Sequence, residues 1–231
     1  MELAKQQLDI GTMVQDWEPA LAFWADKVGL SYTKFEKIGG GVRQHRFDGH
    51  GSVIKVNHCR KTMQAHPTIH RGMRIVCHSV SAPELVHGPE GVDIELVPGG
   101  HDAVVDVEIL NATTNLNEAR RFWVDGVGGI EFEPGRFRIG SSIVRCVEEL
   151  HLQRPTVRTG PGLRYLTVQV QHVDQEWQRL VDMGFTGEME PTSLGETARV
   201  SFVRDPDGGY VEVSERAEFT GRPLPQGVSG A

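Results

Sequence analysis

One carboxylate in this sequence has a direction that a strand-like pattern fixes. The run Tyr210–Ser214 alternates between polar and apolar side chains, so Glu212 lies on the face opposite Val211 and Val213. A carboxylate in mid-strand that points away from the apolar layer must meet solvent, a cation or a ligand. Glu212 could therefore act as a general base or contact a cation, and Tyr210 on the same face could donate a proton.

A second carboxylate occupies the matching place in an internal repeat. Asp205–Ser214 reads DPDGGYVEVS and Gly88–Val97 reads GPEGVDIELV, so that Glu95 aligns with Glu212 without a gap. In both stretches a proline restricts φ and a following glycine tolerates a left-handed backbone, which predicts a tight turn before a last strand. Repetition at this scale indicates a fold built from similar units.

The elements that must position these acids recur in the same order along the chain. Amphipathic alternation, helix caps and glycine-marked turns predict a strand, a helix and three strands in each complete unit. The helices of two units carry a Phe-Trp pair at the same offset, at Phe23–Trp24 and Phe122–Trp123. We expect units at 7–58, 72–98, 103–149 and 163–215, the second of them reduced to its first and last strands.

Composition excludes several classes of function. The net charge of -7 gives no basic footprint for nucleic acid, and no apolar run is long enough to span a membrane. Three widely spaced cysteines form no disulfide framework, and the charged N-terminus lacks the core of a signal peptide. These features predict a cytoplasmic protein that binds neither nucleic acid nor a membrane.

The repeated units and the DPDG turn resemble the vicinal oxygen chelate superfamily, which includes glyoxalase I, extradiol dioxygenases and bleomycin-resistance proteins. The resemblance implies an α+β fold in which tandem βαβββ modules form two curved mixed β-sheet domains with outer helices. We expect these domains at 1–100 and 101–216, followed by a tail at 217–231. Some members of the family are homodimers, so a dimer is open here as well.

The resemblance also implies which positions face the cavities. The first-strand position falls on Asp9, Glu108 and Thr167, and the last-strand position falls on Lys55, Glu95, Arg145 and Glu212. None of them is a histidine, and protonated lysine and arginine cannot ligate a cation. We therefore expect no tightly bound transition metal. A hard divalent cation such as Mg²⁺ or Mn²⁺ is conceivable only on Glu108 and Glu212.

We place the working site in the second domain, because both of its units are complete. Arg145 could bind a carboxylate or an enolate oxygen there, and a buried glutamate could serve as base. The expected catalytic residues are Glu108, Arg145, Tyr165 and Glu212, and the expected substrate-binding residues are Thr167, Gln169, Tyr210, Asp9, His45, Lys55 and Glu95. His45 is included because it shares a strand face with Arg43 and Phe47.

Three functions are consistent with this pattern. The first is an enzyme for a small oxygen-rich or aromatic metabolite, with lyase, isomerase or dioxygenase chemistry. The alternative is a metal-free protein that sequesters a small molecule, as bleomycin-resistance proteins do. In the third, the charged clusters are salt-bridge networks that only fill a degenerate metal site.

Overall fold

The computed structural model describes residues 1–224, and its elements follow the repeated order that the sequence predicts. Helices α1 and α2 each continue as a π-helical turn that contains the Phe-Trp pair. The elements are β1 (Asp9–Val14), α1 (Trp17–Ala22), β2 (Ser31–Gly39), β3 (Val42–Gly49), β4 (Ser52–Cys59), β5 (His70–Val76), β6 (Glu84–His87), β7 (Asp93–Val97), β8 (Val107–Thr113), α2 (Leu116–Arg120), β9 (Ile130–Glu133), β10 (Arg136–Ile139), β11 (Ser142–Glu148), β12 (Gly162–Gln169), α3 (Val173–Asp182), β13 (Thr186–Leu194), β14 (Ala198–Arg204), β15 (Tyr210–Arg216) and α4 (Ala217–Thr220).

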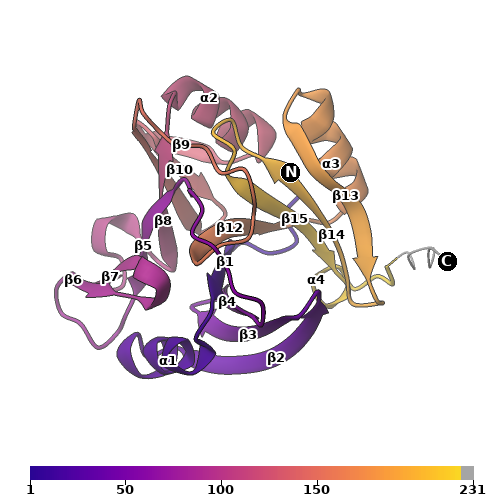
Figure 1. Cartoon of the computed structure of the whole chain (residues 1–231). Coiled ribbons are helices and arrows are strands. Elements are labelled where there is room, and N and C mark those ends of the chain that lie inside the picture. Colours follow the sequence, from indigo (N-terminus) through magenta and orange to yellow (C-terminus); the bar gives the residue numbers. More distant parts are fainter. Residues whose placement is uncertain (225–231) are drawn as a thin grey trace.

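The strands form two mixed, curved sheets, as an α+β fold of this kind requires (Figure 1). The eight-stranded sheet has the order β13-β14-β15-β12-β1-β4-β3-β2, and the seven-stranded sheet has the order β6-β7-β5-β8-β11-β10-β9. In every unit the first strand pairs in parallel with the last strand. Antiparallel pairing of the first strands, β1 with β12 and β5 with β8, then joins two units into one sheet.

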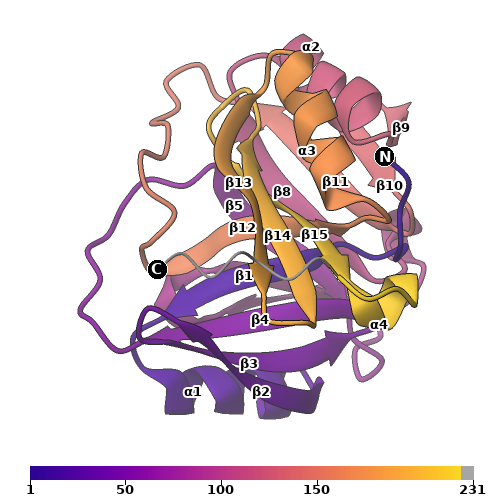
Figure 2. The same cartoon turned by 90° about the vertical axis from the view of Figure 1, so that its right-hand side faces the viewer.

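The pairing of units differs from our expectation of consecutive pairs. The first unit shares its sheet with the fourth, and the second shares its sheet with the third, so a division at residue 100 does not separate the two sheets. The connections 60–69 and 149–161 carry the chain from one sheet to the other, whereas 98–106 stays within the seven-stranded sheet (Figure 2). All first strands carry a similar alternating pattern, which does not specify the partner unit.

Two further details depart from the sequence prediction. A short strand, β6, lies antiparallel to β7 where we expected a loop, so the second unit has three strands. The predicted tail begins with the short helix α4, and its residues 225–231 lie outside the described part of the chain.

One continuous apolar core joins both sheets and the helices on their outer sides. It includes Trp24 and Trp123 from the two Phe-Trp pairs, which are each 1% exposed. Alternation along the central strands directs apolar residues such as Ile10 and Ile54 into this core and leaves the intervening side chains for the other face. None of the helices in residues 1–224 is long and apolar enough to cross a membrane.

Each of the two repeated turns contacts the backbone directly after the first strand of another unit. Asp207 of the DPDG turn accepts a hydrogen bond from the backbone N–H of Thr114, at 3.0 Å, just after β8 ends. Glu90 of the GPEG turn accepts one from the backbone N–H of Gln15, at 2.8 Å, just after β1 ends. Since Thr114 and Gln15 each precede a helix N-cap, the repeat extends from the sequence to these tertiary contacts.

Candidate functional site

The eight-stranded sheet bends around a cavity of about 770 Å³. Strands β2 and β3 form one wall, β13 and β14 form the opposite wall, and side chains of β1, β4, β12 and β15 lie between them. Figure 2 shows β13 and β14 standing nearly upright beside the strands of the first unit. The site therefore combines the first and fourth units, which are the most distant in sequence.

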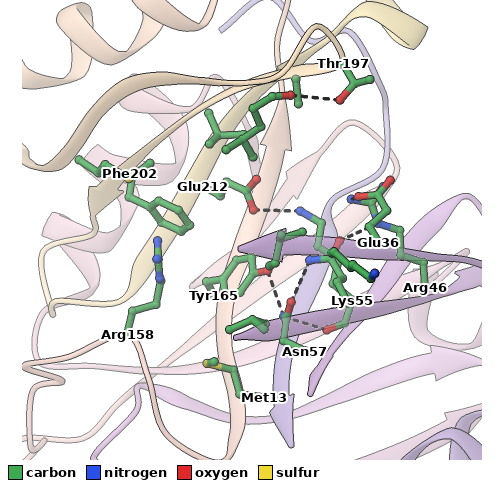
Figure 3. Close-up of a pocket in the computed structure, with 18 of the residues that line it drawn as sticks. Met13, Glu36, Arg46, Lys55, Asn57, Arg158, Tyr165, Thr197, Phe202 and Glu212 are labelled. Carbon is green, nitrogen blue, oxygen red and sulfur yellow. Dashed lines mark hydrogen bonds and ion pairs between the residues drawn. The ribbon is translucent and has the colours of Figure 1, made fainter. Parts of the chain in front are cut away.

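A buried ion pair lies at the inner end of this cavity (Figure 3). The ammonium Nζ of Lys55 is 2.9 Å from Oε2 of Glu212 and 2.7 Å from the hydroxyl of Thr167. Thr167 in turn donates to the same carboxylate oxygen at 3.0 Å, while the Lys55 side chain is only 2% exposed. Three positions that the family resemblance indicated are thus in direct contact.

Asp9, the fourth of these positions, is held by other partners. Its carboxylate accepts hydrogen bonds from the ammonium of Lys5, from Nε2 of Gln169 at 2.9 Å and from the backbone N–H of Val53 at 2.9 Å. Burial alone would raise the pKa of Asp9, but the positive charges of Lys5 and Lys55 hold it below its ordinary value. Asp9 is therefore a buried, ionised counter-ion that helps to neutralise Lys55.

Opposing effects also set the protonation of the central pair. Burial lowers the pKa of Lys55, although the carboxylates of Glu212 and Asp9 raise it in part. Burial would raise the pKa of Glu212, but the Lys55 ammonium and the Thr167 hydroxyl bring it below its ordinary value. The carboxylate of Glu212 is therefore ionised at neutral pH, and the cavity holds a close ammonium–carboxylate pair.

Tyr165 stands beside this pair because Gly11 leaves room for its ring. A Cβ atom at Gly11 would lie 2.2 Å from the Tyr165 ring. The phenol accepts a hydrogen bond from Nδ2 of Asn57 at 3.1 Å, and the ring meets Phe202 edge to face. Burial and the charge of Glu212 raise the pKa of Tyr165, so its hydroxyl is a neutral donor.

Sequence reasoning missed several polar residues of this cavity, namely Gln44, Arg46, Asn57, Arg158 and Arg216. A signal for two of them was present in the strand parity. Asn57 lies two residues after Lys55, and Arg216 lies four residues after Glu212, so each shares a face with a residue that we had placed in a cavity. Arg158 gave no such signal because it lies on the long connection before β12.

A buried arginine fixes the connection that carries Arg158. Arg164 on β12 is 2% exposed, and its guanidinium donates to the carbonyls of Val157 at 2.8 Å, Arg158 at 3.1 Å and His66 at 2.9 Å. It thereby joins both long connections between the sheets. Arg158 is held at the cavity, where its guanidinium lies 3.8 Å from the centre of the Phe202 ring.

The remaining predicted catalytic residues lie on the other sheet. Glu108 contacts Arg136 at 2.8 Å and Arg74 at 3.0 Å, and Glu95 pairs with Arg74 as well. Among the described contacts of Glu108 none comes from Arg145, which lies half-buried on β11. The expected site of Glu108, Arg145, Tyr165 and Glu212 in one cavity is therefore wrong, because the units pair differently.

Of the seven predicted substrate-binding residues, only Lys55 lies among the described residues that line the cavity. Thr167 contacts the central pair, Asp9 and Gln169 contact each other, and Glu95 lies on the other sheet.

His45 and Tyr210 are also absent from the described lining. His45 points to the opposite face of β3, where it stacks on Trp17 at 5.5 Å between ring centres. Phe47, on the same face as His45, belongs to the apolar core, which identifies this face as the wrong one. Tyr210 lies on the predicted face, but its hydroxyl accepts a hydrogen bond from Arg204 at 2.6 Å and packs into the cavity wall.

Comparisons with known proteins agree with this architecture. The sequence profile of the Glyoxalase/Bleomycin resistance protein/Dioxygenase superfamily matches residues 8–213. This chain belongs to that superfamily. No curated protein sequence matches it significantly.

Similar solved structures show the same fold of this superfamily. A glyoxalase I mutant from Zea mays superposes with a TM-score of 0.72 at 9% identity, over 94% of this chain and 97% of that one. A putative dioxygenase from Bacillus subtilis superposes with a TM-score of 0.62 at 14% identity, over 99% and 92% of the two chains. At these identities the likeness concerns the fold alone.

The residues present here do not fit the divalent metal that many superfamily members hold. At the four family positions of this cavity stand Asp9, Lys55, Thr167 and Glu212, of which the ammonium of Lys55 has no lone pair to offer. Asp9 already accepts hydrogen bonds from three other donors. Within residues 1–224, no three His, Cys, Asp or Glu side chains are grouped to hold a metal ion. The alternative metal site on Glu108 and Glu212 is also wrong, because these residues lie on different sheets.

Proposed function

We propose that this chain is a small-molecule binding protein of the superfamily whose binding does not depend on a divalent metal. The observation that carries the proposal is the Lys55 ammonium, which contacts Glu212 and Thr167 where the family positions converge. A positive charge is thus supplied by the chain itself. Ring-cleaving dioxygenase chemistry depends on a metal, and the donors of this cavity do not fit one.

The size and lining of the cavity support a small organic ligand. A volume of about 770 Å³ falls within the range of roughly 300–1,000 Å³ that is usual for such ligands. Apolar side chains from β1, β13 and β14, among them Met13, Met189, Val200 and Phe202, provide an apolar surface for the body of a ligand. Charged and polar side chains, among them Lys55, Asn57 and Arg216, line the same cavity and supply the contacts that would orient a ligand.

A neutral fluorescent probe, N-phenyl-1-naphthylamine, tests this proposal. We expect one probe per chain to bind the native protein, with the same Kd before and after treatment with EDTA. Val42 lines the cavity and is only half-buried, so V42W should block the cavity with little effect on folding. The control V147W adds the same side chain at an exposed position of the seven-stranded sheet.

The two variants separate specific from incidental binding. Loss of probe binding in V42W but not in V147W would support the cavity as the site. Equal binding by V42W and the parent would contradict the proposal, and so would binding that EDTA abolishes.

The close pair of Lys55 and Glu212 favours a second candidate function, metal-independent proton transfer of the lyase or isomerase type. Glu212 is ionised and could take a proton from the carbon next to a carbonyl, while the electron pair moves to the carbonyl oxygen and Lys55 donates a hydrogen bond to it. The reverse step in D₂O would place deuterium on that carbon. Exchange of the methyl protons of pyruvate, followed by NMR, should then be faster with the parent than with E212Q, and equal rates would exclude this candidate for that substrate.

A further inference from the structure

The guanidinium of Arg216 is buried in the cavity wall without a close counter-ion. Its side chain is 8% exposed, and within residues 1–224 its nearest ion-pair partner is the half-exposed Glu218 at 4.0 Å. Burial of a charge is costly unless another charge or several hydrogen bonds compensate for it. A buried, weakly paired guanidinium that faces a cavity indicates a place for an anion.

The charges that line the cavity have the opposite sign from the chain as a whole. Five basic side chains line it, but only two acidic ones, whereas the whole chain has a net charge of -7. Glu36 pairs with Arg46 at 2.5 Å, and Glu212 pairs with Lys55 at 2.9 Å. Both acidic residues of the lining are thus paired with Arg46 and Lys55. Among the described ion pairs, none joins Arg216, Lys37 or Arg158 to an acidic residue of the lining.

Arg46 and Arg216 line the same cavity, and their like charges oppose each other. Burial lowers the pKa of Arg46, and the positive charge of Arg216 lowers it further, although Glu36 opposes both effects. The same Arg216 charge lowers the pKa of Glu36 and of Glu212. An anionic group between the two guanidiniums would relieve this repulsion, and a guanidinium can hold such a group with two parallel hydrogen bonds.

We propose that the ligand of this cavity is an organic anion whose charged group is held by Arg216, with Arg46 beside it, and whose apolar body lies against Met13 and Phe202. The inference rests on the proposed binding function and specifies its ligand class. Carboxylate, sulfonate and phosphate groups share the chemistry that a guanidinium recognises. The apolar walls require a hydrophobic body, so an inorganic anion alone is a poor ligand.

Two probes with the same ring system test the role of the charge. One is 8-anilino-1-naphthalenesulfonate, and the other is N-phenyl-1-naphthylamine, which lacks only the sulfonate. We expect the parent to bind the sulfonate more tightly than the neutral probe. Loss of one charge-assisted contact weakens binding by about 10- to 100-fold. R216Q should therefore raise the Kd of the sulfonate probe by this factor and leave the Kd of the neutral probe unchanged.

Two further variants control for folding and for general electrostatics. R60Q removes a positive charge at an exposed position outside the cavity and should leave both Kd values as in the parent. E36Q removes the partner of Arg46 and should tighten the binding of the sulfonate, which is the opposite direction from R216Q. A variant that misfolds would change the binding of the neutral probe too, because exposed apolar surface binds such probes. Competition by 1-naphthoate, by 1-naphthyl phosphate and by inorganic phosphate then ranks the anionic groups.

The outcomes distinguish this inference from the function on which it rests. Equal affinities of the parent for both probes, or equal effects of R216Q and R60Q, would overturn the anion site while cavity binding of the neutral probe still supported the proposed function. Displacement by inorganic phosphate as effective as by 1-naphthoate would overturn the requirement for an apolar body. Failure of both probes to bind would overturn both proposals.

Discussion

Each of the two sheets of this protein carries a charged cluster on its strands, yet the two clusters have different surroundings. In the eight-stranded sheet, Glu212 contacts Lys55, and both side chains are less than about a tenth exposed. In the seven-stranded sheet, Glu108 is shared by Arg74 and Arg136, and Arg74 is 24% exposed. The first cluster lies at the end of a cavity. The second is a larger network of salt bridges, in which the central Glu108–Arg136 pair is equally buried and the outer acids Asp102 and Glu133 are exposed.

The length of the outer strands explains this difference. β2 and β13 have nine residues each, so they extend beyond the central strands and form the walls of the cavity. Their counterparts in the other sheet, β6 and β9, have four residues each. A sheet with short outer strands covers its central residues less widely. Water therefore reaches the outer acids of the network, Asp102 and Glu133, and screens their charges, whereas Glu108 and Arg136 are buried. Enclosure rather than residue type therefore distinguishes the candidate site from its structural counterpart.

The largest expected difference between the clusters is in stability. K55M would leave the buried carboxylate of Glu212 without its cation, and breaking a buried pair in this way typically costs about 3–5 kcal/mol. R74M should cost much less, about 1 kcal/mol, because Glu108 keeps Arg136 at 2.8 Å. Urea unfolding of both variants measures the difference. Equal losses would show that the two clusters are equally screened.

The repeated turns should differ in their response to pH. Burial raises the pKa of Asp205 to about 7, whereas the corresponding position of the other turn is Gly88, which cannot titrate. Because the unfolded carboxyl ionises at lower pH than the folded one, the parent loses stability as pH rises towards 7. D205N lacks this loss. The free energy of unfolding of D205N, relative to that of the parent, should therefore rise by about 3 kcal/mol between about pH 4.5 and pH 7.

A difference between two proteins isolates this effect from other titrating groups. Burial lowers the pKa of His70 to about 4, which gives a slope of the opposite sign, but this slope occurs in both proteins and cancels. The control D26N removes an exposed carboxylate of the helical turn that follows α1 and should give a flat difference across the same pH range. A flat difference for D205N as well would mean that Asp205 is hydrated in the folded protein.

Much of the fold could be predicted from the sequence because its signals are local. Strand alternation, the Phe-Trp pairs and the two turns define the units, and each first strand does pair with its own last strand. The partner of each unit could not be predicted, because it depends on which first strands meet edge to edge. This one error moved Glu108 and Arg145 into the site and kept Lys55 apart from Glu212.

The candidate site was predicted in part for a similar reason. Asp9, Thr167 and Gln169 were assigned to the correct face, since parity is a property of one strand. His45 was assigned to the wrong side because parity tells which residues share a face but not which face is the cavity. The apolar Phe47 beside it could have decided this point. Arg158 lies on an irregular connection, where no alternating pattern of side chains indicates which residues face the cavity.

The two turns should also differ in how much their acidic residues stabilise the fold. Asp207 is 3% exposed and accepts hydrogen bonds from the hydroxyls of Thr113 and Thr114 and from the backbone N–H of Thr114. D207A would leave these groups unpaired and should cost about 2 kcal/mol. E90A removes a single exposed contact with Gln15 and should cost less than about 1 kcal/mol. Thermal unfolding compares the two variants, and a loss for E90A as large as that for D207A would contradict this order.

The smallest expected effect is that of added metal on the parent protein. Zn²⁺ or Ni²⁺ should not raise its Tm, because Lys55 contacts both Glu212 and Thr167 and offers no lone pair. The double variant K55E/T167H replaces the ammonium by a carboxylate and the hydroxyl by an imidazole, which are suitable donors for these ions. A ligand that binds only the folded state stabilises it, by about 2.7 kcal/mol at a hundredfold excess over Kd, so this variant should gain stability with metal and lose it with EDTA. The single variant T167H keeps the ammonium and should show no such gain. A metal-dependent increase in the parent, reversed by EDTA, would mean that Lys55 leaves its place between Glu212 and Thr167, and the proposal of metal-independent binding would then fail.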